Sequence, residues 1–145
     1  MYKRILVPTD GSDITQQSVQ TAISLAKALG AELHTLCVKE PFPYGAISEM
    51  QPTPPQEFFD AQERIATRHV AAVAEACAAA GVPCEALTVE GLHPWEAIIE
   101  HAQRTGCDLL VMASHGRRGV SALLLGSETQ KVLTHTKIPV LVVRG

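Results

Sequence analysis

Residues 107–133, CDLLVMASHGRRGVSALLLGSETQKVL, contain the pattern that decides the fold. The stretch begins with an apolar run, which is typical of a strand buried on both faces of a parallel sheet. A polar segment with glycines at 116 and 119 follows, and a helical pattern then runs from about Ser127 to His135. The order of strand, loop and helix predicts one unit of an α/β fold.

The same alternation of strand and helix patterns extends along the whole chain. Gly30, Gly81 and Gly106 each follow a helical pattern as a C-terminal stop, and Pro94 suits a first helical turn. The segment 41–55 holds five prolines in fifteen residues, which predicts a loop and a candidate lid. We predict strands at 3–9, 31–40, 82–91, 107–114 and 138–145, and helices at 14–29, 56–81, 93–106 and 127–135.

Strands that alternate with helices imply a parallel sheet, because right-handed crossovers place each helix over the sheet. We expect one α/β domain, 1–145, with a doubly wound five-stranded sheet of order 3-2-1-4-5 and helices on both faces. In that order the winding reverses between the first and fourth strands, and ligands bind at the carboxyl ends of the strands at such a reversal. Those ends carry PTDGS, 8–12, and ASHGRRG, 113–119.

Composition and charge limit the partners and the compartment. The 145 residues are 46% hydrophobic and 4% aromatic, and the net charge of -3 gives no general attraction to nucleic acid or anionic lipid. The four cysteines stand singly, without metal or redox spacing, and read as small buried hydrophobes. We find no signal-peptide core and no membrane-spanning run. We therefore expect a soluble cytoplasmic protein without a nucleic-acid or membrane partner.

The first of the two loops supports two interpretations. The carboxylate of Asp10 can accept hydrogen bonds from a ribose hydroxyl or an exocyclic amine, and the backbone of Pro8 and Thr9 can face a base edge. The simpler interpretation is a turn, in which Asp10 bonds the backbone two residues on and Gly11 supplies the bend. Taken alone, this loop favours the turn.

The second loop has more of the features of a phosphate site. Gly116 and Gly119 let backbone amides approach a ligand, and Gly126-Ser127 opens a helix whose first amides lack internal partners. Phosphate oxygens can take those donors, and Arg117 or Arg118 can add a cation. Alternatively, Ser127 and Gln130 form a capping box that satisfies the same donors. Neither a lysine-bearing phosphate loop nor a G-x-G-x-x-G pattern after the first strand is present.

Three stretches together resemble the universal stress protein family: ILVPTDGS (5–12), DLLVMASHGRRGVSALLLGSETQKVL (108–133) and IPVLVV (138–143). The nucleotide-binding branch of that family carries G-x-x-G-x9-G-[ST] after the fourth strand. Here Gly116, Gly126 and Ser127 match that motif, and Ala113 replaces its first glycine. An added methyl group there is tolerated or crowds the ribose according to the backbone angle.

The resemblance implies a Rossmann-like fold and a site for ATP or AMP, with which Mg²⁺ can bind. Glu128 suits the helix dipole, but it would repel a triphosphate unless Mg²⁺ or an outward rotamer intervenes, which would favour AMP. By resemblance, adenine and ribose would lie against Pro8, Thr9, Asp10, Val38, Met112 and Ala113. The phosphate path would be lined, mostly by backbone amides, by Ser114, His115, Gly116, Arg117, Gly126, Ser127 and Glu128.

Three functions remain open at this point. The leading one is a stress-linked regulatory module that binds an adenine nucleotide and acts as a homodimer through the last strand, Pro139 to Val143, as members of the family commonly do. The second is a weak ATPase, although His115 has no nucleophile, carboxylate pair or metal spacing around it in the sequence, and no residue is assigned a catalytic role. The third is a dimeric interaction protein with an empty crevice. His34, Trp95 and His101 are interpreted as packing or surface residues.

Overall fold

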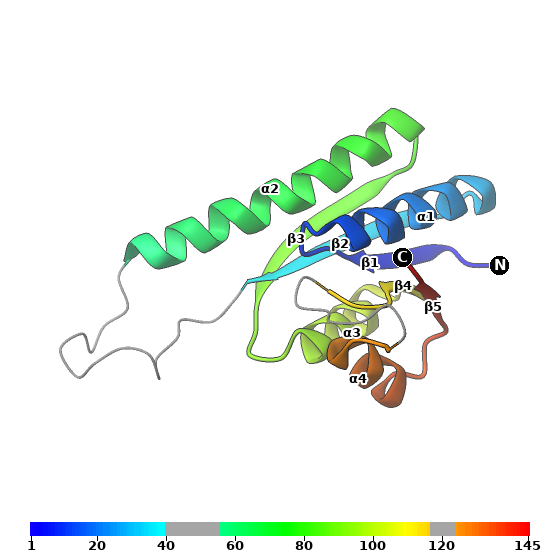
Figure 1. The fold of residues 1–145 in the computed structure, drawn as a ribbon. Coiled ribbons are helices and arrows are strands. Elements are labelled where there is room, and N and C mark those ends of the chain that lie inside the picture. The colour runs from blue at the N-terminus through cyan, green and yellow to red at the C-terminus, as the bar shows by residue number, and fades with distance from the viewer. Residues whose placement is uncertain (40–55, 117–123) are drawn as a thin grey trace.

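The computed structural model describes residues 1–39, 56–116 and 124–145, and these form an alternating series of strands and helices (Figure 1). The predicted lid at 41–55 and the cation candidates Arg117 and Arg118 lie outside the described residues. Each predicted element is present, and the ends differ by a few residues. The elements are β1 (Arg4–Pro8), α1 (Asp13–Leu29), β2 (Glu32–Lys39), α2 (Gln56–Ala80), β3 (Cys84–Glu90), α3 (Pro94–Thr105), β4 (Leu109–Ala113), α4 (Ser127–His135) and β5 (Val140–Val143).

The five strands form one parallel sheet in the order β3-β2-β1-β4-β5, which confirms the predicted order. Strand β1 pairs with β2 on one side, where Pro8 lies opposite Leu36, and with β4 on the other, where Leu6 lies opposite Leu110. Helices α1 and α2 cover one face of the sheet, and α3 and α4 cover the other (Figure 1). The winding therefore reverses between β1 and β4, as expected.

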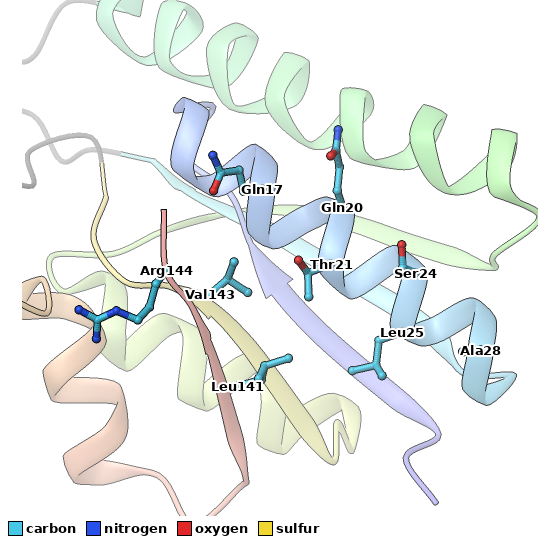
Figure 2. A pocket seen from close by; sticks show the side chains of 9 residues that line it. All are labelled: Gln17, Gln20, Thr21, Ser24, Leu25, Ala28, Leu141, Val143 and Arg144. Atoms are coloured by element: carbon cyan, nitrogen blue, oxygen red, sulfur yellow. The ribbon is translucent and has the colours of Figure 1, made fainter. Parts of the chain in front are cut away.

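Strand β5 is an edge strand, and a shallow groove runs between it and α1 (Figure 2). Leu141 and Val143 face α1 across this groove, where Thr21 and Leu25 line the other side. Leu141 is 40% exposed, whereas the leucines of the central strands β1 and β4 are buried. The groove lies along the edge of the sheet and is separate from the crevice between β1 and β4.

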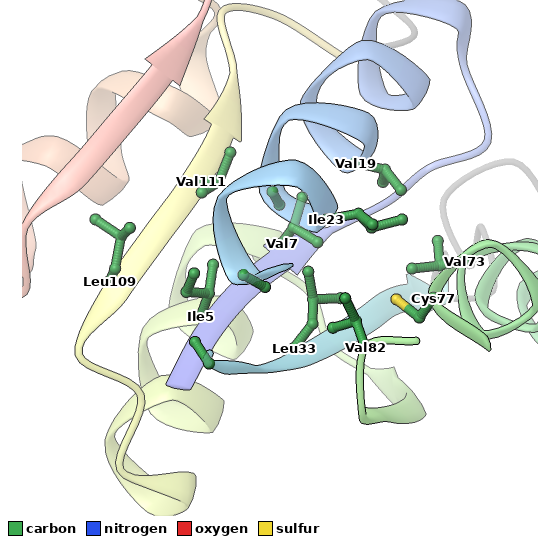
Figure 3. Close-up of a cluster of buried hydrophobic side chains, with 13 residues drawn as sticks. Ile5, Val7, Val19, Ile23, Leu33, Val73, Cys77, Val82, Leu109 and Val111 are labelled. Carbon is green, nitrogen blue, oxygen red and sulfur yellow. The ribbon is translucent and has the colours of Figure 1, made fainter. Parts of the chain in front are cut away.

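Each face of the sheet carries its own apolar cluster, because successive side chains of a strand point to opposite faces. Ile5 and Val7 of β1 lie in the cluster under α1 and α2 (Figure 3), whereas Leu6 lies in the cluster under α3 and α4. Leu110 and Met112 of β4 belong to that second cluster. The continuous apolar runs of the sequence thus correspond to strands that are buried on both faces.

The helices end where the sequence predicts a stop. Gly30 and Gly106 follow α1 and α3 with φ values of 67° and 70°, a left-handed conformation that glycine adopts without a steric cost. Among the described residues, no helix is both long enough and apolar enough to cross a membrane.

All four cysteines lie among the described residues and none is in a disulfide, and three of them, Cys37, Cys77 and Cys107, are buried. Burial, followed by the neighbouring Cys84, raises the pKa of the Cys77 thiol to about 12. Such a thiol is not a nucleophile at neutral pH, which agrees with a packing role.

Candidate functional site

The loops that follow β1 and β4 meet at the carboxyl edge of the sheet. A β-carbon added at Gly116 would lie 3.0 Å from Oδ2 of Asp10, so the two loops are in contact at these residues. The end of β2 adjoins them, because the amide of Thr9 donates to the carbonyl of Leu36 over 2.9 Å. The structure therefore brings together the two loops that the strand order indicates as a ligand site.

The loop after β1 is organised by Asp10. Its Oδ1 accepts hydrogen bonds from the amide of Ser12 (2.9 Å) and from the hydroxyl of Thr15 (3.0 Å), which is the turn weighed from the sequence. Gly11 has a φ of 78°, and a side chain there would overlap the ring of His69 of α2. Since the Thr9 amide is already bonded to Leu36, it is not a donor to a base.

The side chain of Ser12 caps α1. Its Oγ accepts the amide of Thr15 over 3.4 Å, and α1 begins at Asp13, one residue earlier than predicted. Asp13 adds a carboxylate to the positive end of the helix dipole. The start of α1 is thus supplied with acceptors from its own loop.

The end of β4 is fixed by three hydrogen bonds. The Ser114 amide donates to the Val143 carbonyl of β5 (2.9 Å), and its carbonyl accepts the Gly126 amide (2.7 Å). The hydroxyl of Thr129 donates to the Ala113 carbonyl over 2.8 Å. No described residue other than glycine has a positive φ, so the backbone at Ala113 does not require the glycine of the family motif.

The start of α4 differs from the sequence prediction. The N-cap is Gly126, with φ −64° and ψ 153°, and no side chain of the described residues caps the helix. The capping box predicted for Ser127 and Gln130 is wrong, because Ser127 is already helical and the Gln130 amide group donates to the Leu125 carbonyl (2.8 Å). The first-turn amides of α4 are therefore left without a side-chain acceptor.

Gly126 is needed for space. A β-carbon added there would lie 3.0 Å from Cα and 3.2 Å from Cβ of His115. Its φ is accessible to any residue, so the close approach of two backbone segments accounts for the glycine. This contact sets the first turn of α4 against the loop that follows β4.

Glu128 is turned toward α3. Its Oε2 accepts the backbone amide of Trp95 over 2.9 Å, in the first turn of that helix. This is the outward rotamer considered from the sequence. The charge of Glu128 is thus placed at the positive ends of two helix dipoles, its own and that of α3.

The remaining predicted residues occupy different positions. Val38 is half-buried near the end of β2 and packs against the cluster under α3 and α4. Met112 is buried in the same cluster, so only its backbone is near the crevice. His115 is half-buried, with Nδ1 3.2 Å from the Gly116 carbonyl. Arg117 lies outside the described residues.

Two buried histidines lie away from this site, between β2 and α3. Nε2 of His34 is 2.9 Å from Oε1 of Glu32, and this hydrogen bond is the main cause that lowers the pKa of Glu32. Burial lowers the pKa of His101, and Arg104 and His34 lower it further. Within 1–39, 56–116 and 124–145, no group of three or more possible ligands could hold a metal ion.

Sequence reasoning missed one part that Trp95 plays. The predicted packing role is confirmed, because its ring packs against the cluster under α3 and α4 and stacks on His135, with 4.4 Å between centroids and 27° between planes. The sequence does not reveal that its amide is the partner of Glu128. The available signal was a proline at the start of α3 with no capping side chain before it, which leaves amide donors to be satisfied from elsewhere. The partner itself is 33 residues away in sequence.

The fold places this chain among the doubly wound parallel α/β domains, a class in which ligands commonly bind at the carboxyl ends of the strands where the winding reverses. The model of the universal stress protein family matches residues 1–144, and the chain belongs to that family. A universal stress protein of Thermus aquaticus is 39% identical over 145 residues, covering 99% of this chain and 100% of the relative.

Two solved structures are similar over nearly the whole chain. Hypothetical protein MJ0577 of Methanocaldococcus jannaschii has a TM-score of 0.85 and 27% identity, covering 100% of this chain and 97% of that one. A universal stress protein in complex with cAMP has a TM-score of 0.69 and 28% identity, covering 99% and 97%.

Proposed function

We propose that this universal stress protein is a regulatory module that binds an adenine nucleotide, AMP or ATP, in the crevice between β1 and β4. The observation that carries the proposal is the start of α4, which lacks a side-chain cap and lies against the loop after β4. Phosphate oxygens are suitable acceptors for such amides, and the helix dipole favours their negative charge.

The described residues fit a nucleotide at both ends of the crevice. Ser127 and Glu128 offer first-turn amides to phosphate, and Gly126 brings them close to His115. Asp10 holds its turn through Oδ1 and directs Oδ2 toward Gly116, where a ribose hydroxyl could be received. The site we propose consists of Pro8, Thr9, Asp10, Val38, Met112, Ala113, Ser114, His115, Gly116, Arg117, Gly126, Ser127 and Glu128.

The cAMP complex of a similar protein supports the same class of ligand, because that protein shares 28% of its residues and nearly its whole length with this chain. Mg²⁺ would accompany the phosphates of ATP, with the nucleotide supplying most of its ligands. We also propose a cytoplasmic location, because cysteines that stand singly as small buried apolar residues are typical of proteins in a reducing compartment.

The test is to purify the protein in gentle buffer, denature it, and identify any released small molecule by chromatography and mass spectrometry. Near-stoichiometric adenine nucleotide, absent from a Gly126→Asp control, would support the proposal and identify the phosphate length. An empty protein that gives no heat with AMP, ATP or cAMP in calorimetry would overturn it, leaving a dimeric interaction protein.

We further propose that the protein forms a homodimer through its last strand, Pro139 to Val143. Edge strand β5 offers unpaired backbone groups, and its exposed Leu141 borders an apolar groove beside α1. Sedimentation should show a dimer that dissociates on Leu141→Asp. The matched control is Leu87→Asp, a leucine 43% exposed on the opposite edge strand β3. A monomeric native protein, or equal effects of both changes, would contradict this assembly.

A further inference from the structure

Both ends of α4 contact one residue of α3. In its first turn, Oε2 of Glu128 accepts the amide of Trp95 over 2.9 Å. At its last residue, the ring of His135 stacks on the indole of Trp95 at 4.4 Å between centroids. Trp95 therefore contacts α4 through its backbone at one end and through its side chain at the other.

Helix α4 has few other attachments. It is nine residues long and buries only Thr129 and Val132, and isolated helices of this length are marginal in water. Apart from Trp95, its first turn is held by the bond from Thr129 to the Ala113 carbonyl and by the bond from Gly126 to the Ser114 carbonyl. Val132 packs with Ile98 and Ile99 of α3 in the apolar cluster, and the bond to Trp95 joins the first turn of α4 to the start of α3.

The same contact supplies a hydrogen-bond acceptor at the start of α3. The N-cap of α3 is His93, which makes no side-chain cap bond, and Pro94 follows it. The Trp95 amide is one of the donors that a helix start leaves without an internal partner. A carboxylate is a strong acceptor for it, so the bond is charge-assisted and stabilises both helix starts at once.

From this geometry we propose that Glu128 and Trp95 position the start of α4 for phosphate binding. This inference rests on the proposed function, and it assigns the two residues a positioning role that acts through the amides of Ser127 and Glu128. Because coupling between two contacts is reciprocal, a nucleotide bound at α4 must stabilise the bond between Glu128 and Trp95 by the same factor by which that bond strengthens binding.

The experiment compares the native protein with Glu128→Ala, Glu128→Gln and Glu96→Ala, with calorimetry of AMP binding and hydrogen exchange of the Trp95 amide by NMR. Glu128→Gln keeps an acceptor for the amide, whereas Glu128→Ala removes it. Glu96 is the matched control, because it is an exposed carboxylate in the first turn of α3.

We expect Glu128→Ala to bind AMP about fivefold to tenfold more weakly, a loss comparable to that of a helix cap. Glu128→Gln should lose less affinity than Glu128→Ala, about twofold to threefold, because a neutral acceptor retains roughly half of a charge-assisted hydrogen bond. Glu96→Ala should bind as the native protein does. AMP should slow exchange of the Trp95 amide in the native protein and in Glu128→Gln, and leave it unchanged in Glu128→Ala.

Two results would overturn the inference alone: AMP binding by Glu128→Ala that is as tight as native binding, or native exchange at Trp95 that AMP does not alter. If the native protein binds neither AMP nor ATP, the proposed function fails and this inference fails with it. The two failures are distinguishable, because the second is seen before any residue is changed.

Discussion

Helices α1 and α4 begin at the same edge of the sheet, after the neighbouring strands β1 and β4, yet their starts are built differently. The start of α1 is capped by Ser12 and braced by Asp10, whose Oδ1 accepts both the Ser12 amide and the Thr15 hydroxyl. The start of α4 has glycine as its N-cap and no side-chain cap among the described residues.

The two kinds of helix start favour different properties: the capped start favours folding stability, and the uncapped start favours ligand binding. A helix start with a side-chain cap and carboxylates beside it, as at Ser12, Asp10 and Asp13, stabilises the folded state and attracts an anionic ligand less. A start without such acceptors is less stable alone but can receive a phosphate. In the proposed site, we therefore call the start of α1 the closed wall and the start of α4 the receptive wall.

The largest expected effect is on the closed wall. Gly11→Ala should lower the free energy of unfolding by about 2 to 4 kcal/mol, because it combines a left-handed φ with overlap of the His69 ring. Gly81→Ala is the control, since its φ is 74° with nothing within 4 Å, and it should cost about 1 kcal/mol. Urea unfolding measures both. Equal losses would mean that the contact with His69 does not close this loop.

At the receptive wall, substitution of Gly126 should cause the largest loss of nucleotide affinity. Gly126→Asp adds a carboxylate to the phosphate path and a β-carbon 3.0 Å from Cα of His115, and should weaken AMP binding about 100-fold or more. Gly126→Ala adds only the β-carbon and should lose less. Calorimetry with AMP compares the two variants. If both lose affinity equally, space rather than charge controls the site.

Substitution of Ser12 and of Ser127 compares the starts of α1 and α4. Ser12→Ala removes the acceptor for the Thr15 amide and should cost about 1 kcal/mol of stability. Ser127→Ala changes a residue inside the first turn that is not the cap, and should cost less than about 0.5 kcal/mol. Thermal and urea unfolding of both variants would show the difference. A larger loss at Ser127 would contradict the assignment of Gly126 as the cap.

The charge of Glu128 should have a smaller effect, on the choice of nucleotide. Glu128→Gln keeps the length of the side chain but removes a carboxylate near the start of α4. The affinity for ATP relative to AMP, without Mg²⁺, should rise about threefold, because ATP brings more negative charge to the same wall. Glu96→Gln is the control. An unchanged ratio would show that α3 already neutralises this carboxylate.

The smallest expected effect is on the pH dependence of folding stability, and it involves His101 and Glu32, which lie away from both helix starts. The folded state lowers the pKa of His101 below 6.5, so the unfolded chain binds more protons once the pH falls through 6.5, and stability decreases there. His101→Gln should flatten this part of the stability profile. The lowered pKa of Glu32 acts in the same direction below its ordinary value of 4.5. A native profile that is flat between pH 7 and 5.5 would contradict this assignment.

Much of the fold could be predicted from the sequence, because local patterns determine it. The apolar run of β4, the helical period of α1 and the left-handed glycines at 30 and 106 are all readable without neighbours. The alternation of strands and helices predicts a parallel sheet with right-handed crossovers, and the structure agrees with the order expected for a doubly wound sheet.

The candidate site could be predicted only in part. Gly126 and Ser127 are both common N-cap residues, and the close approach to His115, a tertiary contact, decides between them. The bond from Trp95 to Glu128 joins residues 33 apart in sequence, on helices whose contact depends on the whole sheet. Local pattern therefore locates the wall of the site, whereas packing decides which donors are free for a ligand.

Ser114 connects the edge strand of the sheet to the start of α4 through its backbone. Its amide donates to the Val143 carbonyl of the edge strand, and its carbonyl accepts the amide of Gly126, so Ser114 links β5 to the N-cap of α4. Ser114 is 3% exposed, and water has little access to replace either bond. A shift of β5 along β4 would therefore be transmitted through Ser114 to Gly126, the N-cap of α4.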